Sequence, residues 1–222
     1  MFDLKMLDMK RLLVTLLGAF LFLCGPNAFA QLSSGDKTPS FGGGFTSFGL
    51  GGPDVEIMER HQFPNMIPGF YFGASIDYAF SSVDGLTVEP GAYIAHYGKT
   101  FKFGLADDDK SYHANYLRIP LDLKYSFTMD DSAIGLAVYT GPRFNIGVGG
   151  NMFSAGKTYP GLKPLDVQWG FGIALTLQDA VVIRGGYDFG ITNCIKNNKD
   201  LSFEDMIVKR NTLTIGANFL FK

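Results

Sequence analysis

Eight charged side chains recur at alternate positions in stretches that are otherwise apolar or rich in small residues. The eight are Asp77, Arg118, Asp122, Lys124, Arg143, Asp166, Arg184 and Asp188. If these stretches are β-strands, the charges lie on the face opposite the apolar residues, because successive side chains of a strand point to opposite faces. Charges in an enclosed interior are costly unless they pair. We interpret the set as ion pairs that fill an interior, with a narrow polar or ionic pathway as the alternative.

Other residues are candidates for calcium binding or hydrolysis. The acidic run at residues 107–109 offers the carboxylate oxygens that Ca²⁺ prefers, but it lacks the ligand spacing and the glycine of an EF-hand loop. His113 is close in sequence to Ser111 and to this run, so these residues are the candidates for a Ser/His/acid set. The remaining histidines are His61 and His96.

The catalytic and cofactor motifs with known spacing are absent from the chain. It contains no Walker loop, no HExxH, no GxSxG and no zinc-ligand spacing. We therefore predict a protein that is not an enzyme, with no catalytic, cofactor-binding or metal site. Residues 107–109 are then a solvated loop.

Composition favours short strands over helices. The 222 residues include 28 glycines, 14% are aromatic and only 18% are charged, a balance that suits repeated strands. The net charge of −2 offers no electrostatic basis for nucleic-acid binding. The mean hydropathy is +0.11, a value that fits a membrane β-barrel, in which only alternate residues face lipid.

Residues 1–30 have the organisation of a signal peptide. Lys10 and Arg11 form a basic region, residues 12–24 are apolar, and residues 28–30 read Ala-Phe-Ala, a small-x-small cleavage site. The mature chain is expected to begin at Gln31, with an uncleaved membrane anchor as the alternative. Beyond residue 30 no segment is long and apolar enough to be a membrane-spanning helix.

From about residue 69 onward the chain alternates between apolar and polar or small residues. This period of two predicts seven strands, at residues 70–81, 86–99, 117–127, 133–149, 165–177, 181–191 and 212–221. Short links at 84–85, 129–132 and 178–179 alternate with long links at 100–114, 150–164 and 193–210. Outer-membrane barrels have this arrangement, with short periplasmic turns and long external loops. Asp84-Gly85 is predicted as a hairpin turn, because both residues tolerate a positive φ.

The odd number of predicted strands, seven, indicates one further strand whose alternation is weak. Single-chain bacterial barrels have an even number, and the strand at 70–81 needs a partner before it. Residues 41–50 and residues 55–63 are the two alternatives. The expected organisation is a signal peptide at 1–30, a Gly/Ser/Phe-rich segment at 31–52 that is either disordered or contains part of the first strand, and an outer-membrane barrel at 53–222.

The chemistry of the two faces distinguishes a membrane barrel from a soluble one. The polar face consists mainly of Gly, Ser, Thr, Asn and Ala with a few charges of both signs, whereas a water-facing exterior would be crowded with Lys and Glu. The other face is almost wholly apolar and ends in aromatic residues such as Tyr125 and Phe219, as lipid-facing bands do. The prediction is an all-β, eight-stranded antiparallel up-and-down transmembrane β-barrel. A soluble β-barrel that binds an apolar ligand is the alternative.

The segment YLRIPLDLKYSF at residues 116–127 resembles the PorT-type family of outer-membrane β-barrel proteins. The segments GFYFGASIDYAF, LTVEPGAYIAHYG, GPRFNIGVGG, DVQWGFGIAL, VIRGGYDFGITN and RNTLTIGANFLF agree, so the resemblance covers most of residues 69–221. It implies an eight-stranded barrel in the outer membrane. The namesake of the family is tied to protein secretion, and most members have no assigned activity.

The sequence thus predicts an integral protein of the outer membrane without evident catalysis. It is expected to act as a structural, adhesive or secretion-accessory component through its external loops, because rigid scaffolds carry function on loops. A lipid-modifying barrel enzyme is the alternative. Expected partners are outer-membrane lipid, the barrel-assembly machinery, for which Phe221 is the terminal aromatic residue, and an unidentified protein at the external loops.

Overall fold

The computed structural model describes residues 37–54, 56, 66–80, 83–101, 110–127, 134–154, 161–196 and 206–221. In these ranges the chain forms eight strands and one short 3-10 helix. The strands are β1 (Lys37–Gly51), β2 (Met66–Ala79), β3 (Leu86–Phe101), β4 (Lys110–Phe127), β5 (Ile134–Gly149), β6 (Leu165–Leu177), β7 (Val181–Gly190) and β8 (Lys209–Leu220), and the helix η1 (Asn151–Phe153) follows β5. The predicted signal peptide at 1–30 lies outside the described residues.

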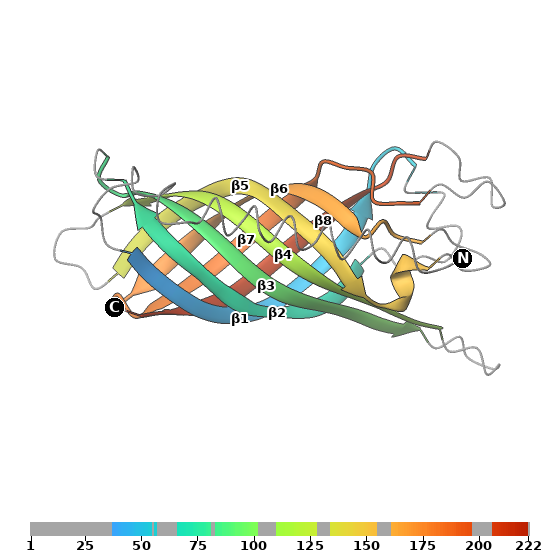
Figure 1. Ribbon diagram of the computed structural model, residues 1–222, viewed down its shortest axis with the longest axis horizontal. Coiled ribbons are helices and arrows are strands. Elements are labelled where there is room, and N and C mark those ends of the chain that lie inside the picture. The colour runs from blue at the N-terminus through green and yellow to red at the C-terminus, as the bar shows by residue number, and fades with distance from the viewer. Residues whose placement is uncertain are drawn as a thin grey trace, which may run out of the picture.

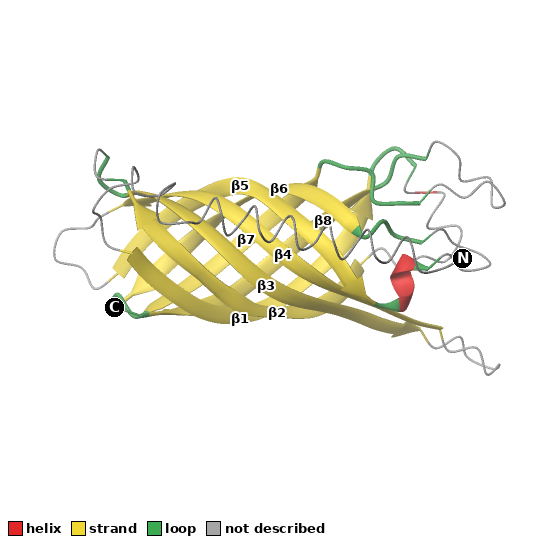
Figure 2. Ribbon diagram, in the orientation of Figure 1, coloured by secondary structure: helices red, strands yellow, loops and turns green. Residues whose placement is uncertain are grey.

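The eight strands form one closed antiparallel barrel in sequence order. Each strand pairs with its neighbours along the chain, and β1 closes the barrel against β8 through pairs such as Phe45 with Ile215. Figures 1 and 2 show the strands tilted around a common axis, with the C-terminus and the short turns at one end and the longer loops at the other. The predicted eight-stranded up-and-down barrel is confirmed. In the described part of the chain, no helix is long and apolar enough to cross a membrane.

The first strand begins earlier than the predicted start of the barrel at residue 53. β1 spans Lys37–Gly51 and includes the alternative at 41–50, so the segment 31–52 contains a whole strand. Three consecutive glycines, Gly42 to Gly44, conceal it in the sequence because glycine supplies neither hydrophobicity nor β propensity. Added Cβ atoms at Gly42 and Gly44 would collide with the backbone of β8, so these glycines allow β8 to pass close to β1.

The hairpin of β3 and β4 is longer than predicted. Pairing continues to Thr100 with Ser111 and to Phe101 with Lys110, inside the expected link at 100–114. The hairpin projects past the other strands at the end of the longer loops (Figure 1). The prediction was too short because the outward side chains become polar beyond Ile94 and Leu117, which ends the apolar alternation although the strands continue.

The two short turns that the structure describes have different geometries. Gln178 and Asp179 have φ values of 50° and 52°, and the amide of Ala180 donates to the Leu177 carbonyl at 3.0 Å. Two consecutive positive φ values are typical of a type I′ hairpin turn. In the predicted Asp84-Gly85 turn, only Gly85 has a positive φ, of 79°. The connection between β2 and β3 is longer than a two-residue turn, because the hydrogen bond that closes it runs from the Phe80 amide to the Leu86 carbonyl, at 2.9 Å.

The two faces of the barrel differ in polarity as the alternation predicts. The outer wall carries exposed large apolar side chains on every strand, from Phe45 of β1 to Phe219 of β8. The inner face carries buried polar and charged side chains such as Arg118 and Asp122. The membrane-facing side is therefore the apolar one, and the interior is a polar core.

Candidate functional site

The centre of the barrel holds a continuous column of ion pairs in which acids and bases alternate. Its order is Asp77, Lys124, Glu89, Arg184, Asp122, Arg143, Asp188, Arg118. Four cations face four anions, so the formal charges of the column cancel. The side chains come from β2, β3, β4, β5 and β7, and adjacent members of the column come from different strands. The column runs from Asp77, near the short-turn end, toward the long-loop end at Arg118.

Each internal member of the column touches two partners of opposite charge. Arg143 donates to Asp122 Oδ1 at 2.5 Å and lies 3.3 Å from Asp188 Oδ1. Arg184 reaches Asp122 Oδ2 at 3.3 Å and pairs with Glu89. Arg118 donates to Asp188 Oδ2 at 2.5 Å. Because no charge of this buried column is left alone, the large desolvation cost of its ions is offset by pairing.

Neutral side chains complete the hydrogen bonding at the short-turn half of the column. Ser75 donates to Glu89 Oε1 at 2.7 Å, and Tyr93 donates to Ser75 at 3.1 Å. Asn218 of β8 donates to the Tyr93 hydroxyl at 3.1 Å. The network therefore joins β2, β3 and β8, and it holds the Glu89 carboxylate in one arrangement.

A separate ion pair lies above the column, toward the long-loop end. Arg210 donates to Asp166 Oδ2 through Nη2 at 2.7 Å and through Nε at 3.1 Å. Both side chains are completely buried, at 0% and 1% exposure. The Arg210 guanidinium lies 4.0 Å from the ring centre of Tyr116, and the rings of Phe48 and Tyr97 are within 6 Å. Three aromatic faces thus surround this cation, an arrangement that stabilises a desolvated guanidinium.

Very little empty space remains inside the barrel. One cavity of about 50 Å³ lies beside Arg118, Arg143 and Arg184, and another of about 10 Å³ lies between Asp77 and Lys124. A cavity needs about 10–15 Å³ of such space for each water, so the larger cavity has room for a few waters and the smaller one for about one. In the described residues, the column fills the interior in the way expected for a narrow eight-stranded barrel.

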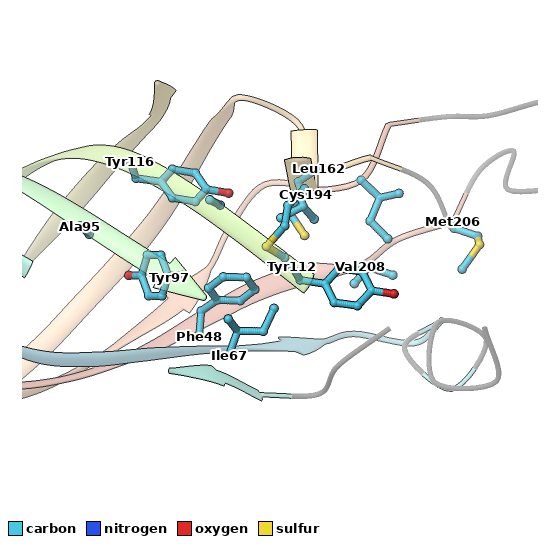
Figure 3. Packing of buried hydrophobic residues seen from close by; sticks show 13 residues of the cluster. Phe48, Ile67, Ala95, Tyr97, Tyr112, Tyr116, Leu162, Cys194, Met206 and Val208 are labelled. Atoms are coloured by element: carbon cyan, nitrogen blue, oxygen red, sulfur yellow. The ribbon is translucent and has the colours of Figure 1, made fainter. Parts of the chain in front are cut away.

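The long-loop end is closed by an apolar cluster, shown in Figure 3. Inward side chains of the strands meet side chains of the loops there; the buried members are Phe48, Ile67, Ala95, Tyr97, Tyr112, Ala114, Tyr116, Met152, Leu162, Cys194, Ile195, Met206 and Val208. We call this set the mouth cluster. Leu162 and Ile195 form a bridge between two loops. Burial raises the pKa of the Cys194 thiol to about 12. The loops are thereby attached to the barrel by a hydrophobic core of their own.

The structure brings seven of the eight charged residues of the sequence prediction into the column. The eighth, Asp166, pairs with Arg210 instead. Sequence reasoning missed Glu89 and Arg210. Glu89 is in the strand predicted at 86–99. The inward residues Tyr93 and Tyr97 of that strand are aromatic, so residue polarity does not show which of its faces points inward. Arg210 falls at the end of the predicted link 193–210, whereas β8 begins at Lys209.

The other candidate residues do not form a site in the described part of the chain. Ser111 accepts a hydrogen bond from Thr100 at 3.4 Å, and the backbone amide of His113 donates to Asn151 at 2.9 Å. His96 contacts the Asn115 side chain at 2.7 Å on the outer wall. Among the described residues, no cluster of three or more His, Cys, Asp or Glu side chains has metal-binding geometry. The predicted calcium candidate at 107–109 lies outside those residues, as does His61.

The chain is similar to solved β-barrel structures at low sequence identity. The attachment invasion locus protein Ail of Yersinia pestis, solved with the heparin analogue sucrose octasulfate, is 13% identical, with a TM-score of 0.47 over 84% of this chain and 100% of that chain. Neisserial surface protein A is 11% identical, with a TM-score of 0.47 and the same coverage. A de novo designed transmembrane β-barrel is 12% identical, with a TM-score of 0.38 over 83% of this chain and 95% of that chain. No curated protein gives a significant sequence match.

A family model supplies the assignment that these distant structures do not. The model of the outer membrane protein beta-barrel domain matches residues 29–196, well over half of the 222 residues. The match agrees with the closed eight-stranded barrel, its apolar outer wall and its polar interior. The protein therefore belongs to the outer membrane protein beta-barrel domain family and is located in the outer membrane.

Proposed function

We propose that this protein is a non-conducting outer-membrane scaffold that acts through its external face on a protein partner. The observation that carries the proposal is the filled interior. An eight-membered column of paired charges occupies the barrel, and the cavities beside it measure about 50 and 10 Å³. A hydrated ion or a nutrient needs a continuous path, and this column offers none.

The mouth cluster supports a role for the external face. Loop residues such as Met152, Leu162 and Ile195 are buried against the barrel. A loop with its own hydrophobic anchor presents its surface in a defined shape, which lowers the entropic cost of binding a partner. The role is then structural, adhesive or secretion-accessory, and it does not involve catalysis.

Conductance in a planar lipid bilayer tests the non-conducting part of the proposal. The purified wild-type protein is expected to give no stable current steps. A variant with Arg118, Arg143 and Arg184 all changed to serine removes three large cations and should conduct, provided that it still migrates as a folded barrel on an unboiled gel. Stable steps from the wild-type protein would overturn the proposal.

Replacement of external sequence tests the partner-binding part. A Gly/Ser linker in place of residues 155–160 leaves Met152 and Leu162 of the mouth cluster intact. We expect it to weaken attachment of expressing cells to host or neighbouring cells, or to impair secretion by those cells. The matched control is the same replacement at residues 128–133, at the opposite end of the barrel. Equal effects of the two replacements would contradict a role for the external face.

The roles within the proposal and the enzymatic alternative make different predictions. The resemblance to the PorT-type family supports the secretion-accessory role, so deletion of the protein would block export of cargo without changing cell attachment. A lipid-modifying enzyme would require His113, whose substitution by alanine would then alter membrane lipids while leaving barrel assembly intact. We expect no such change in lipids.

A further inference from the structure

The ladder between the two strands β6 and β7 is interrupted at the long-loop end. The last regular pair is Gln168 with Gly190, and pairing resumes at Leu162 with Ile195. Between these two pairs, the five residues 163–167 face the four residues 191–194. An extra residue on one side cannot pair, so the ladder is locally disrupted as at a β-bulge.

The backbone hydrogen bonds show how the strands separate and meet again. The Val167 carbonyl accepts from the amides of both Ile191 and Thr192, at 2.9 and 3.3 Å. The Thr192 hydroxyl accepts from the Val167 amide at 2.9 Å. Farther out, the Lys163 amide donates to the Cys194 carbonyl at 2.7 Å. Hydrogen bonds therefore join the two segments on both sides of the interrupted pairing, and this arrangement is part of the folded barrel wall.

A groove of about 480 Å³ occupies this separation. It is lined by Lys163, Pro164, Leu165, Val167, Thr192 and Asn193. Leu165 and Val167 point to the same side of β6 as Trp169, and both Leu165 and Trp169 are nearly half exposed on the outer wall. Trp and Tyr concentrate at membrane interfaces. The groove thus continues from the lipid-facing band into the region where lipid headgroups lie.

The charge in the groove is of one sign. Among the described residues that line it, Lys163 alone is charged. The neighbouring Asp166 points into the barrel, where Arg210 binds it. Asn193 is occupied by a hydrogen bond to the Met206 carbonyl at 2.6 Å. The β6 side of the groove is apolar, formed by Pro164, Leu165 and Val167, with Lys163 next to them in the chain, and Thr192 and Asn193 form the other side.

We propose that this groove binds a phosphate-bearing lipid of the surrounding membrane, with the phosphate on the Lys163 ammonium and the first part of an acyl chain against Leu165 and Val167. A lipid is the occupant that this wall selects, because the groove opens on the membrane-facing side and adds a cation to an apolar surface. Lysine commonly extends its ammonium to the headgroup level in this way. The inference depends on the outer-membrane location and not on the proposed external role.

Native mass spectrometry of the detergent-solubilised protein is the test. The protein is titrated with phosphatidylglycerol, an anionic lipid, or with phosphatidylcholine, which carries no net charge. We expect the first phosphatidylglycerol to bind more tightly than phosphatidylcholine. Lys163→Ala should weaken its binding by about tenfold, the size of a lost charge-assisted hydrogen bond. Lys37→Ala, which changes a lysine at the opposite end of the barrel, is the matched control and should bind as the wild type does.

A second variant separates the groove from its charge. Val167→Phe keeps Lys163 but fills the groove with an outward apolar ring, which the lipid-facing wall tolerates, and it should also weaken binding. An unboiled gel confirms that each variant is folded. Equal affinities of wild type and Lys163→Ala, or of the two lipids, would overturn the proposal. Unchanged binding by Val167→Phe would show that a surface charge alone attracts the lipid, and would overturn the groove as the site.

Discussion

Loss of Arg210 should destabilise the barrel strongly, and neutralising Asp166 should rescue part of that loss. Arg210 and Asp166 are both fully buried and joined at 2.7 and 3.1 Å. Arg210→Met replaces the guanidinium with an apolar side chain of similar length. The Asp166 carboxylate is then buried without its cation. Among the described residues, the hydrogen bonds that remain to this carboxylate are long, from Asn145 at 3.3 Å and from Thr192 at 3.4 Å. Breaking a buried pair in this way costs about 3–5 kcal/mol of unfolding free energy.

The double variant separates the charge from the packing. Adding Asp166→Asn to Arg210→Met removes the second charge, and neutral replacements of buried pairs are often close to neutral in stability. What remains is the loss of the aromatic contacts of the guanidinium, about 2 kcal/mol when desolvated. The double variant is therefore expected to be more stable than Arg210→Met alone, by about 1–3 kcal/mol.

Urea unfolding in lipid vesicles measures these differences. Trp169 is the only tryptophan of the chain and lies on the lipid-facing wall, so its fluorescence reports unfolding. Lys37→Met is the control, since in the described part of the chain the Lys37 side chain makes an exposed cation–π contact with Tyr78, worth about 0.5–1 kcal/mol. A cost below about 1 kcal/mol for Arg210→Met, or a double variant less stable than Arg210→Met, would refute the reasoning from buried charge.

Three further predictions use the same preparation. Gly172→Val should cost about 1–3 kcal/mol because an added Cβ collides with the Tyr139 ring, whereas Gly185→Ala, with nothing within 4 Å of its Cβ, should leave the urea midpoint unchanged. Gln178→Val should lower the urea midpoint because φ is 50° there, a conformation that a β-branched side chain tolerates less well than an unbranched one, and an unchanged midpoint would contradict that backbone conformation. The pKa of the Cys194 thiol, raised to about 12, should make maleimide labelling at pH 8 slower than in the unfolded chain by on the order of a thousandfold. Labelling of the folded protein should accelerate as pH rises toward that pKa, and equal rates at pH 8 would contradict burial of the thiol.

The sequence predicted those parts of the fold that depend on the pattern of neighbouring residues in the chain. Alternation between polar and apolar residues placed seven strands and eight of their inward charges, although not Glu89, because side-chain direction in a strand depends only on position. The strand at Lys37–Gly51 escaped the pattern since its glycines carry no polarity. The ribbon of β3 and β4 was cut short because its outer end leaves the membrane and loses the apolar signal.

The partners of the charged residues were beyond the reach of the local pattern. Arg184 binds Glu89 from a strand 95 residues away in sequence, and Arg210 binds Asp166 from one 44 residues away. Which cation meets which anion depends on strand register, barrel closure and the depth of each side chain in the interior. The sequence alone therefore determined the β architecture, the two faces and the outer-membrane environment, because these follow from period and polarity. The tertiary structure alone decided the order of the column, the mouth cluster and the groove beside Lys163, because each joins segments that are distant in the chain.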